Sequence, residues 1–425
     1  MNYEAPTIEQ ALDAFLSGIS CMDEQERLPL LNALGRVLAE DIRAPFSVPS
    51  FPKSAMDGYA VCAAEVEGAS RENPAVLKVI GERLAGGSVE LPFAGALTAV
   101  RIMTGAEVPP MYDAVVREED TDYGEAEVRI FRGVTKYQNY CAVGEDIREG
   151  DVVLSAGTRL GRIEIGTLAS LGITFVPVKR KLKVAIISTG TELVDPGAVK
   201  QDAGTAEPDA GTGDAPSALP PGLIYNSIAY MLEASLIAAG FEADHSIYRD
   251  DAGEIEAAVR MAAKAADVVI TTGGVSVGKK DLIPGVLESL GADIRFRRAR
   301  IQPGTPTIGS VYRGTPVLSL SGNPYAAVVN FDIYFWPLAA KMTGCDAFLP
   351  VVEEAVLVSP YEKVNAMRRL LRARVEHGQV TLPSKSHASS VLSNLTACNC
   401  YLDLPGGRRI KPGDRVTIRR MQNTF

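Results

Sequence analysis

The sequence is poor in histidine and has no Cys-x-x-Cys pair. It contains 3 histidines and 6 cysteines in 425 residues, and no two cysteines form a Cys-x-x-Cys pair. This composition argues against a zinc site and against a disulfide framework, so we expect reduced thiols. Cys398 and Cys400 are either a metal-binding pair or two positions on one face of a strand, and we favour the strand. Since His387 is one of so few histidines, we expect chemistry by carboxylates, hydroxyl groups and the backbone.

Long apolar runs and excess positive charge are also absent. No uninterrupted apolar stretch approaches the ~18 residues of a membrane span, and Met1 to Glu4 lack the positive start of a signal peptide. The net charge is −9 with an isoelectric point near 5.2, which argues against a nucleic-acid surface. We therefore expect a cytoplasmic protein without membrane or nucleic-acid partners. An acidic protein that binds phosphates also needs a divalent cation to offset the repulsion.

The length of the chain, and the changes in residue pattern along it, predict three or four folded units. A capping box begins at Thr7 and opens one helix, and a second helix is expected to carry Leu30 to Leu38 and to end before Pro45. From Pro45 to Cys141, glycine and proline punctuate short alternating runs, which indicates a small β barrel or sandwich. A short helix is expected over 162–171, and from Asp346 the chain again has short β runs.

Between these units, strands alternate with helices, which predicts a parallel sheet covered by helices on both faces. The expected strands are 183–187, 243–248, 268–270 and 317–320, and the expected helices are 226–239, 254–265 and 282–290. The tract 196–222 is rich in glycine, alanine, proline and aspartate without apolar periodicity, and we interpret it as a disordered surface insertion.

The loop after the strand 268–270 has the composition of a phosphate-binding turn. Thr271 and Thr272 precede Gly273 and Gly274, and Ser276 follows, so hydroxyl groups surround backbone N–H groups that no Cβ shields. Ligands of open α/β sheets bind beyond the carboxyl ends of strands. Asp281 stands near the start of the next helix, where it either caps the helix or reaches a metal. The alternative for the whole loop is an ordinary glycine-rich turn.

Further polar loops follow other expected strands and turns. Asp57 lies in a loop constrained by glycine and proline, and Thr104 lies in a similar one. Asp146 is a turn residue by local pattern, as Asp57 is beside Gly58. Glu192 follows the strand 183–187, and Asn323, with Pro324 behind it, has the pattern of a helix N-cap.

Six of these segments, in this order, resemble the MoeA family of molybdopterin molybdenumtransferases, which is related to the E domain of gephyrin. They are SAMDGYAV (54–61), RIMTGA (101–106), GEDI (144–147), STGTEL (188–193), TTGGVSVG (271–278) and SGNP (321–324). The resemblance implies a multidomain α/β plus β fold. A helical linker domain (1–45 and 143–177) would carry an inserted β-rich domain (46–142), followed by a three-layer α/β molybdopterin-binding domain with a mostly parallel sheet (178–345) and a small C-terminal β-barrel (346–425).

The resemblance also implies an L-shaped homodimer with its site at the dimer interface. Adenylylated molybdopterin would be cleaved with Mg²⁺, molybdate or tungstate inserted at the dithiolene, and AMP released. The implied catalytic residues are Asp57, Thr104, Asp146 and Glu192, with Asp57, Glu192 and Asp250 (or Asp251) toward the metal. Gly273, Gly274, Ser276 and Asp281 would hold the pterin phosphate, and Asn323, Arg372 and Ser389 would line the cofactor and oxyanion site. The molybdopterin adenylyltransferase and apo-molybdoenzymes are expected partners.

The chain departs from the family at its oxyanion pocket. The family reads K-P-G-K-P where this sequence has Gln302-Pro303-Gly304-Thr305-Pro306, and a serine is replaced by Ala326. Losing two cations weakens the attraction for a dianion. Arg298, Arg300 or Lys279 are candidates to replace them. We therefore expect weakened molybdate handling or a preference for another oxyanion such as tungstate.

Three functions remain open from the sequence. The first is an active metal-inserting transferase, favoured because the acidic residues are kept as a group. The second is a catalytically reduced paralogue that binds molybdopterin or acts as a scaffold, favoured by the lost lysines. The third, a nucleotide-binding oxidoreductase, lacks the expected G-x-G-x-x-G after a first strand.

Overall fold

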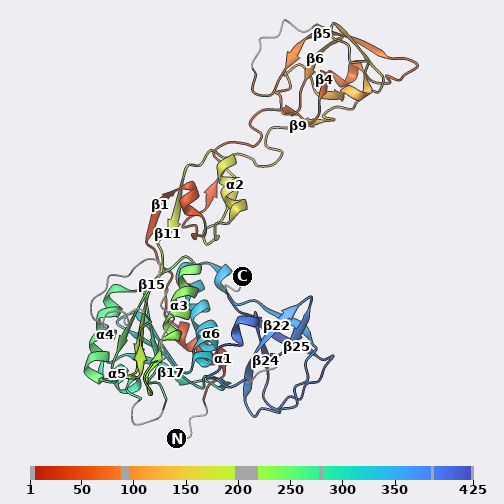
Figure 1. Ribbon diagram of the computed structural model, residues 1–425. Helices are drawn as coiled ribbons and strands as arrows, with labels where there is room; N and C mark the ends of the chain where they lie inside the picture. The colour runs from red at the N-terminus through yellow and green to blue at the C-terminus, as the bar shows by residue number, and fades with distance from the viewer. Residues whose placement is uncertain (1–4, 88–94, 197–218, 277–280, 384–386, 423–425) are drawn as a thin grey trace, which may run out of the picture.

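The computed structural model describes residues 5–87, 95–196, 219–276, 281–383 and 387–422. The chain is elongated (Figure 1): a β-rich domain lies at one end, a narrow middle segment follows, and an α/β domain with a barrel beside it forms the other end. This arrangement confirms the multidomain fold expected from the sequence. None of the helices in the described ranges is long and apolar enough to cross a membrane.

The α/β domain is built on a six-stranded sheet with the order β15-β12-β16-β20-β19-β17. The first four strands are parallel to one another, and β19 runs antiparallel to both of its neighbours, β20 and β17. The bounds are β12 Lys183–Thr189, β15 Glu242–Tyr248, β16 Val268–Thr272, β17 Asp293–Arg298, β19 Pro306–Tyr312 and β20 Thr315–Leu320. The strands β13 Leu193–Val194 and β14 Ile224–Tyr225 form a separate two-stranded parallel sheet. The mostly parallel sheet agrees with the sequence prediction.

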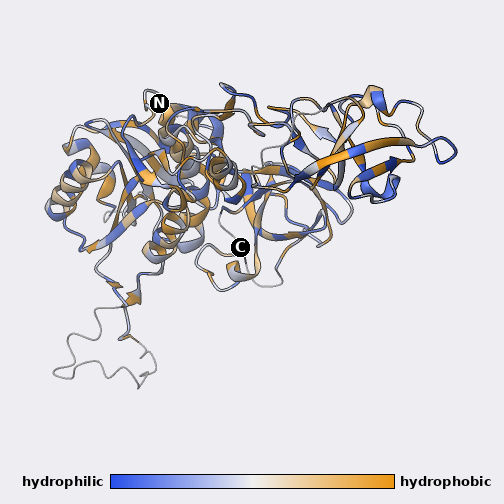
Figure 2. Ribbon diagram, turned by 90° about the horizontal axis from the view of Figure 1, so that it is seen from above, coloured by the Kyte–Doolittle hydropathy of each residue, from blue (hydrophilic) through white to orange (hydrophobic). Residues whose placement is uncertain are grey.

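Helices cover both faces of this sheet and make three layers. One face packs against α1 Ile8–Leu16, α3 Ser227–Ala238 and α6 Pro324–Thr343, and the other against α4 Ala252–Ala265 and α5 Ile283–Ser289. The central strands are buried on both faces because their two sets of alternating side chains enter separate apolar clusters. Figure 2 shows apolar stretches along the strands of this domain and of the distal β-rich domain.

The first helix belongs physically to this α/β core. Thr7 and Gln10 form the predicted capping box, which satisfies two otherwise unpaired N–H groups. Phe15 is fully buried and its ring lies 6.1 Å from that of Phe296 on β17. Our domain boundaries stay a prediction, but α1 packs with the α/β domain although both the middle segment and the distal domain separate them in sequence.

The middle segment lacks the second helix predicted over residues 30–45, so that prediction is wrong. Only a short 3₁₀ turn, η1 Leu30–Ala33, occurs there; it follows β1 Gln25–Pro29, which pairs antiparallel with β11 Phe175–Lys179. Val37 and Leu38 form β-bridges with residues more than 100 positions later. The leucines have helical spacing, but local helix propensity is a weak preference, and β pairing with distant strands determined the structure here. The remaining elements are β2 Ile42–Arg43, β10 Val152–Leu154 and the expected helix, α2 Arg162–Ser170.

The distal domain is β-rich, as predicted. Its five-stranded sheet has the order β7-β4-β6-β5-β8 and is buried on both faces by separate apolar clusters. The strands are β3 Lys53–Ser54, β4 Gly58–Val61, β5 Ala75–Arg83, β6 Thr98–Ile102, β7 Ala114–Arg117, β8 Glu127–Ile130 and β9 Tyr140–Cys141, with the short turns η2 Ala63–Glu65 and η3 Glu118–Asp120.

The C-terminal domain is the expected small barrel. The strands β22, β23, β21, β25 and β24 pair in turn, and pairing of β22 with β24 closes the ring. Their bounds are β21 Val352–Leu357, β22 Arg368–Glu376, β23 Gln379–Thr381, β24 Cys400–Leu404 and β25 Arg415–Arg420, with η5 Asp346–Phe348 and η6 Leu395–Ala397 between them. Cys400 lies in β24, but Cys398 only precedes it. Both are free and buried, which raises the pKa of each thiol.

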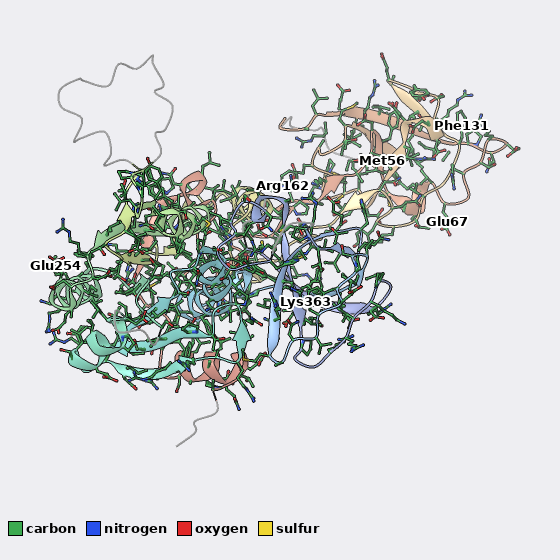
Figure 3. The ribbon with its side chains drawn as sticks, turned by 60° about the horizontal axis from the view of Figure 1, so that its bottom comes forward. Met56, Glu67, Phe131, Arg162, Glu254 and Lys363 are labelled. Carbon is green, nitrogen blue, oxygen red and sulfur yellow. The ribbon has the colours of Figure 1, made fainter. Side chains whose placement is uncertain are left out.

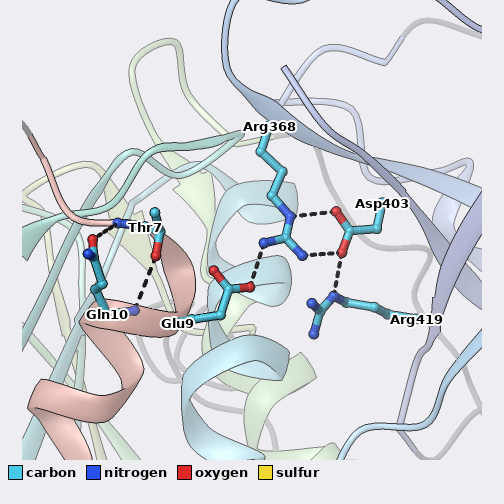
Figure 4. Close-up of polar contacts among 6 residues, drawn as sticks. All are labelled: Thr7, Glu9, Gln10, Arg368, Asp403 and Arg419. Atoms are coloured by element: carbon cyan, nitrogen blue, oxygen red, sulfur yellow. Dashed lines mark hydrogen bonds and ion pairs between the residues drawn. The ribbon is translucent and has the colours of Figure 1, made fainter. Parts of the chain in front are cut away.

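Several contacts attach the barrel to the α/β domain, among them the bond of 2.6 Å from the Tyr401 hydroxyl to Asp332 of α6. The strand β18 Ile301–Gln302 leaves the α/β domain and pairs in parallel with β22. Arg368 of β22 also bridges two carboxylates, donating to Asp403 with two bonds of 2.6 Å and to Glu9 of α1 at 2.6 Å (Figure 4). Arg419 donates to the same Asp403 at 2.7 Å. The seam between the two domains is therefore held in one register.

Candidate functional site

Three loops meet at the carboxyl edge of the parallel sheet. They follow β12, β16 and β20, which are neighbours in the sheet. A buried chain of polar contacts ties the first two together: Thr272 Oγ1 and Asn226 Nδ2 each lie 3.0 Å from Ser188 Oγ. Satisfied hydrogen bonds of this kind keep a buried polar cluster in one arrangement.

Two glycines let these loops approach each other closely. Gly273 has φ +91°, and a Cβ there would lie 2.4 Å from the carbonyl oxygen of Thr189. Gly274 also has positive φ, +62°. A Cβ on Gly322, in the third loop, would sit 3.5 Å from the Cα of Gly273. Both glycines are therefore required by the backbone. The Gly273 N–H donates to the Leu320 carbonyl at 3.0 Å, and the phosphate-binding role of the two glycines stays a prediction.

The remaining residues of this turn are placed less simply. Ser276 is exposed. Residues 277–280 lie outside the described ranges, and they include Lys279, one of the proposed replacements for the missing lysines. Capping by Asp281 was one of our two interpretations; the structure instead has Leu282 as the N-cap of α5, without a side-chain cap bond, and contact of Asp281 with a metal or the pterin phosphate stays a prediction. Asn323 does occupy the N-cap of α6, but it makes no side-chain cap bond.

Two acidic residues lie at the same edge of the sheet. Thr191 donates to Asp250 Oδ2 from its hydroxyl at 3.1 Å, and Glu192 follows it directly. The carboxylate of Glu192 lies so close to Gly190 that a Cβ there would be 2.8 Å from it. Asp251 instead caps α4 by accepting the Glu254 N–H at 2.9 Å. Of the two neighbouring aspartates, Asp250 is therefore the better metal-ligand candidate.

Asp57 and Thr104 form a second polar unit on the distal domain. Asp57 Oδ1 accepts the backbone N–H of Thr104 at 2.6 Å and its hydroxyl at 2.8 Å. These two bonds, the backbone one first, lower the pKa of Asp57. The carboxylate is exposed, and its Oδ2 is not part of this contact. Asp146 is an exposed turn residue of the middle segment whose N–H bonds to the Val48 carbonyl at 3.1 Å.

These acidic residues do not meet within one chain. In Figure 3, Met56 beside Asp57 and Glu254 beside the Asp250 loop lie on opposite sides of the molecule. Among the described residues, no three acidic, histidine or cysteine side chains form a group that could hold a metal ion. The oxygen donors suit Mg²⁺ chemically, but a single chain supplies only part of a coordination shell.

A cavity of about 410 Å³ lies where the α/β loops face the barrel. Its lining brings together the residues expected at the oxyanion pocket: Gln302, Thr305, Asn323, Ala326 and Ser389. The loop 302–306 is held against α6, because Asn330 Nδ2 donates to the Gly304 carbonyl at 2.7 Å. The Thr305 hydroxyl donates to the Ile301 carbonyl at 2.6 Å, so it is already engaged.

Arg372 is not among the residues that line this cavity. Its side chain is fully buried, donates to the Ala388 carbonyl at 2.7 Å and stacks 3.6 Å from the ring centre of Tyr325. It also bonds to the Val391 carbonyl and to Asn394. Burial lowers the pKa of this guanidinium. Arg372 therefore holds the loop of Ser389 in place, and direct contact with a ligand stays a prediction.

The structure adds two lining residues that sequence reasoning missed, Arg369 and His387. Burial, then the charges of Arg372, Arg369 and Lys363, lower the pKa of His387 to about 4. The proposed substitutes Arg298 and Arg300 are not among the lining residues. No local motif marks Arg369 or His387; only the closing of the barrel against the 302–306 loop brings them together.

Sequence comparisons cover nearly the whole chain. Three family descriptions match: "MoeA N-terminal region (domain I and II)" over residues 6–172, "Probable molybdopterin binding domain" over 185–341 and "MoeA C-terminal region (domain IV)" over 354–419. A molybdopterin molybdenumtransferase of Bacillus subtilis is 37% identical over 394 residues, 91% of this chain and 87% of that protein. The one of Staphylococcus epidermidis is 35% identical over 393 residues, 91% and 88% respectively.

Solved structures agree with these matches. The molybdopterin biosynthesis MoeA protein from Pyrococcus horikoshii superposes with a TM-score of 0.81 at 30% identity, over 99% of this chain and 100% of that one. A molybdenum cofactor biosynthesis protein from Pyrococcus furiosus, 20% identical, shares the fold with a TM-score of 0.59. With its domains, its loop cluster and its relatives all in accord, this chain belongs to the MoeA family.

Proposed function

We propose that this protein is a molybdopterin molybdenumtransferase that cleaves adenylylated molybdopterin, releases AMP and inserts molybdate or tungstate at the dithiolene. The observation that carries the proposal is the 410 Å³ cavity. It lies between the glycine-rich loop cluster and the barrel, and its lining contains the residues expected at the oxyanion site. The two relatives named molybdopterin molybdenumtransferase align with 91% of this chain.

In this mechanism the loop cluster binds the substrate. The N–H of Gly274 and the exposed Ser276 hydroxyl hold the pterin phosphate, because no Cβ on residue 274 stands in front of them. The Gly273 N–H donates to the Leu320 carbonyl at 3.0 Å, so Gly273 shapes the turn that places these donors. Asp57, Glu192 and Asp250 supply carboxylate oxygens for Mg²⁺, which when bound neutralises the charge of the phosphoanhydride. Thr104 orients Asp57 through the two bonds described above. Asp146 is the fourth acidic residue of the proposed site.

The separation of these groups supports a homodimer as the active form. In one chain Asp57 and Thr104 lie in loops of the distal domain, before β4 and after β6, whereas Glu192 follows β12 of the α/β domain at the other end of the molecule (Figure 1). A second copy with twofold symmetry brings the distal domain of one protomer to the sheet edge of the other, and it makes two equivalent sites. Each site then uses carboxylates from both protomers.

Mixed dimers test this assembly. A chain with Asp57→Asn and a chain with Glu192→Gln are each expected to be inactive. Random mixing gives half heterodimers with one intact site of two, so activity returns to about a quarter of the wild-type value. No recovery on mixing contradicts shared sites.

AMP release from adenylylated molybdopterin, measured with and without EDTA, tests the reaction. We expect release that requires Mg²⁺ and increases with molybdate or tungstate. The second candidate is a molybdopterin-binding module without turnover, favoured by Gln302 and by the engaged hydroxyl of Thr305. Tight ligand binding without AMP release under any condition supports that candidate. Handover from a molybdopterin adenylyltransferase, delivery to apo-molybdoenzymes and a cytoplasmic location remain predictions.

A further inference from the structure

The 410 Å³ cavity between the α/β loops and the barrel is more positively charged than the sequence of its 302–306 loop indicates. The two positions where lysines were expected are Gln302 and Thr305, and neither carries a charge. The described lining residues nevertheless include Arg369 and His387, and they include no carboxylate. Asn323 and Ala326 at the start of the 20-residue helix α6 add the positive end of a helix dipole. Every charged contribution to this cavity therefore favours an anion.

Arg369 is the permanent cation of the cavity. Its neighbour Arg368 is paired with Asp403 and Glu9, and Arg374 on the same strand is paired with Glu376. Arg369 instead donates to the neutral side chain of Asn365 at 3.0 Å, and its buried Nε has no hydrogen-bond partner among the described residues. Because no carboxylate neutralises it there, its charge is available to a ligand.

His387 faces the same cavity from the loop after β23. Its ring is partly buried, and its Nδ1 is buried without a hydrogen-bond partner within the described ranges. The charged groups that act on it are Arg372 and Arg369 from β22 and Lys363 from the segment before that strand. Burial of the ring first, and then these three cations, disfavour a proton on the imidazole while the cavity holds no anion.

We propose that Arg369 and His387 replace the missing lysines as the oxyanion-holding pair, and that His387 takes up a proton from solvent when a tetrahedral dianion binds. This inference rests on the proposed function and identifies residues that set its anion specificity. The added negative charge offsets the repulsion from the three cations, and the imidazolium then donates to an anion oxygen. Anion binding breaks and forms no other covalent bond, since the proton is only taken up from solvent and released again at a ring nitrogen of His387.

The expected consequence is an affinity that increases as the pH falls. His387 has a pKa of about 4 in the empty cavity. If the bound anion restores the ordinary value of 6.5, affinity is about tenfold higher at pH 5.5 than at pH 8, and about three quarters of a proton is taken up per anion at pH 6. A pocket of lysines would show neither effect in this range, because lysine stays charged.

Isothermal titration calorimetry with the full chain tests this directly. Sulfate and tungstate are the probes, and sulfate remains a dianion over the whole pH range. Titrations in two buffers of different ionisation enthalpy give the protons taken up by the unaltered protein, without any variant. Proton uptake near the expected value supports the inference. No uptake, or no binding of either anion at millimolar concentrations, overturns it.

Two variants assign the effect. His387→Asn keeps a hydrogen-bonding side chain but cannot be protonated, so binding should become independent of pH; His377→Asn, on an exposed turn, is its control. Arg369→Gln should weaken binding at every pH by at least tenfold, whereas Arg374→Gln, outside the cavity, should not. Unchanged pH dependence in His387→Asn contradicts the proposal. AMP release without proton-coupled binding leaves the proposed function intact, and proton-coupled binding without AMP release refutes only the proposed function.

Discussion

Removing the charge of Asp403 should loosen the seam on which the anion cavity depends. Asp403 is 4% exposed and accepts three bonds from two arginines, at 2.6, 2.6 and 2.7 Å. Asp403→Asn keeps the shape but leaves Arg368 and Arg419 without their shared counter-ion. Breaking a buried pair in this way costs about 3–5 kcal/mol. Since both arginines keep some exposure to solvent, we expect a value near the lower limit.

A second variant of the same network provides a comparison for the loss of unfolding free energy in Asp403→Asn. Glu9 also accepts from Arg368, but its side chain is 58% exposed, so Glu9→Gln should cost about 0.5 kcal/mol. Urea unfolding measures both. The fluorescence of the single tryptophan, Trp336, which is buried in α6, reports unfolding of the α/β domain that carries Glu9, whereas Asp403 lies in β24 of the barrel. Far-UV circular dichroism of the same samples shows whether other domains unfold separately.

The pH dependence gives an independent check. Burial opposes ionisation of Asp403, but its bonds to Arg368 and the charges of both arginines outweigh it and hold its pKa below the usual 3.8. The stabilisation is therefore present above pH 3.8 and is lost as the pH falls through the lowered value. Equal small losses in Asp403→Asn and Glu9→Gln would refute the reasoning, as would a loss in Asp403→Asn without weaker anion binding at the seam.

Two further predictions concern the α/β domain. Burial raises the pKa of Asp332 to about 6; because this lies above the unfolded value of 3.8, stability should fall by at most about 3 kcal/mol as the pH rises from 4 to 6, and Asp332→Asn should remove that loss in urea titrations at several pH values. Gly273→Ala places a Cβ 2.4 Å from the Thr189 carbonyl at positive φ, so it should cost about 2 kcal/mol or more in thermal unfolding. Its control, Gly285→Ala, meets no atom within 4 Å in helix α5 and should be neutral or slightly stabilising; equal effects of the two would contradict the steric argument.

The elements predicted well are those whose signal is local and regular. The capping box at Thr7, the alternation of strands and helices after residue 181 and the glycine turn after β16 each need only neighbouring residues to be read. The helix expected over 30–45 failed for the opposite reason. Its leucines have helical spacing, but Val37 and Leu38 pair with strands that the chain supplies much later, and no local pattern contains that partner.

The candidate site divides in the same way. Motifs of adjacent residues located the loops of Asp57, Glu192, Gly273 and Asn323. Arg369 and His387 belong to no motif, and histidine scarcity even argued against a histidine at the site.

The sequence by itself determined the family, the order of the domains and the residue types at each loop, because short motifs and hydrophobic periodicity are written in contiguous residues. Only the tertiary structure decided which loops meet. Closing the barrel turns Arg369 and His387 toward the 302–306 loop, whereas Asp57 is carried away to the distal domain. The physical reason is that charge and burial act through space, so the cations around the cavity become a common field only once the chain is folded.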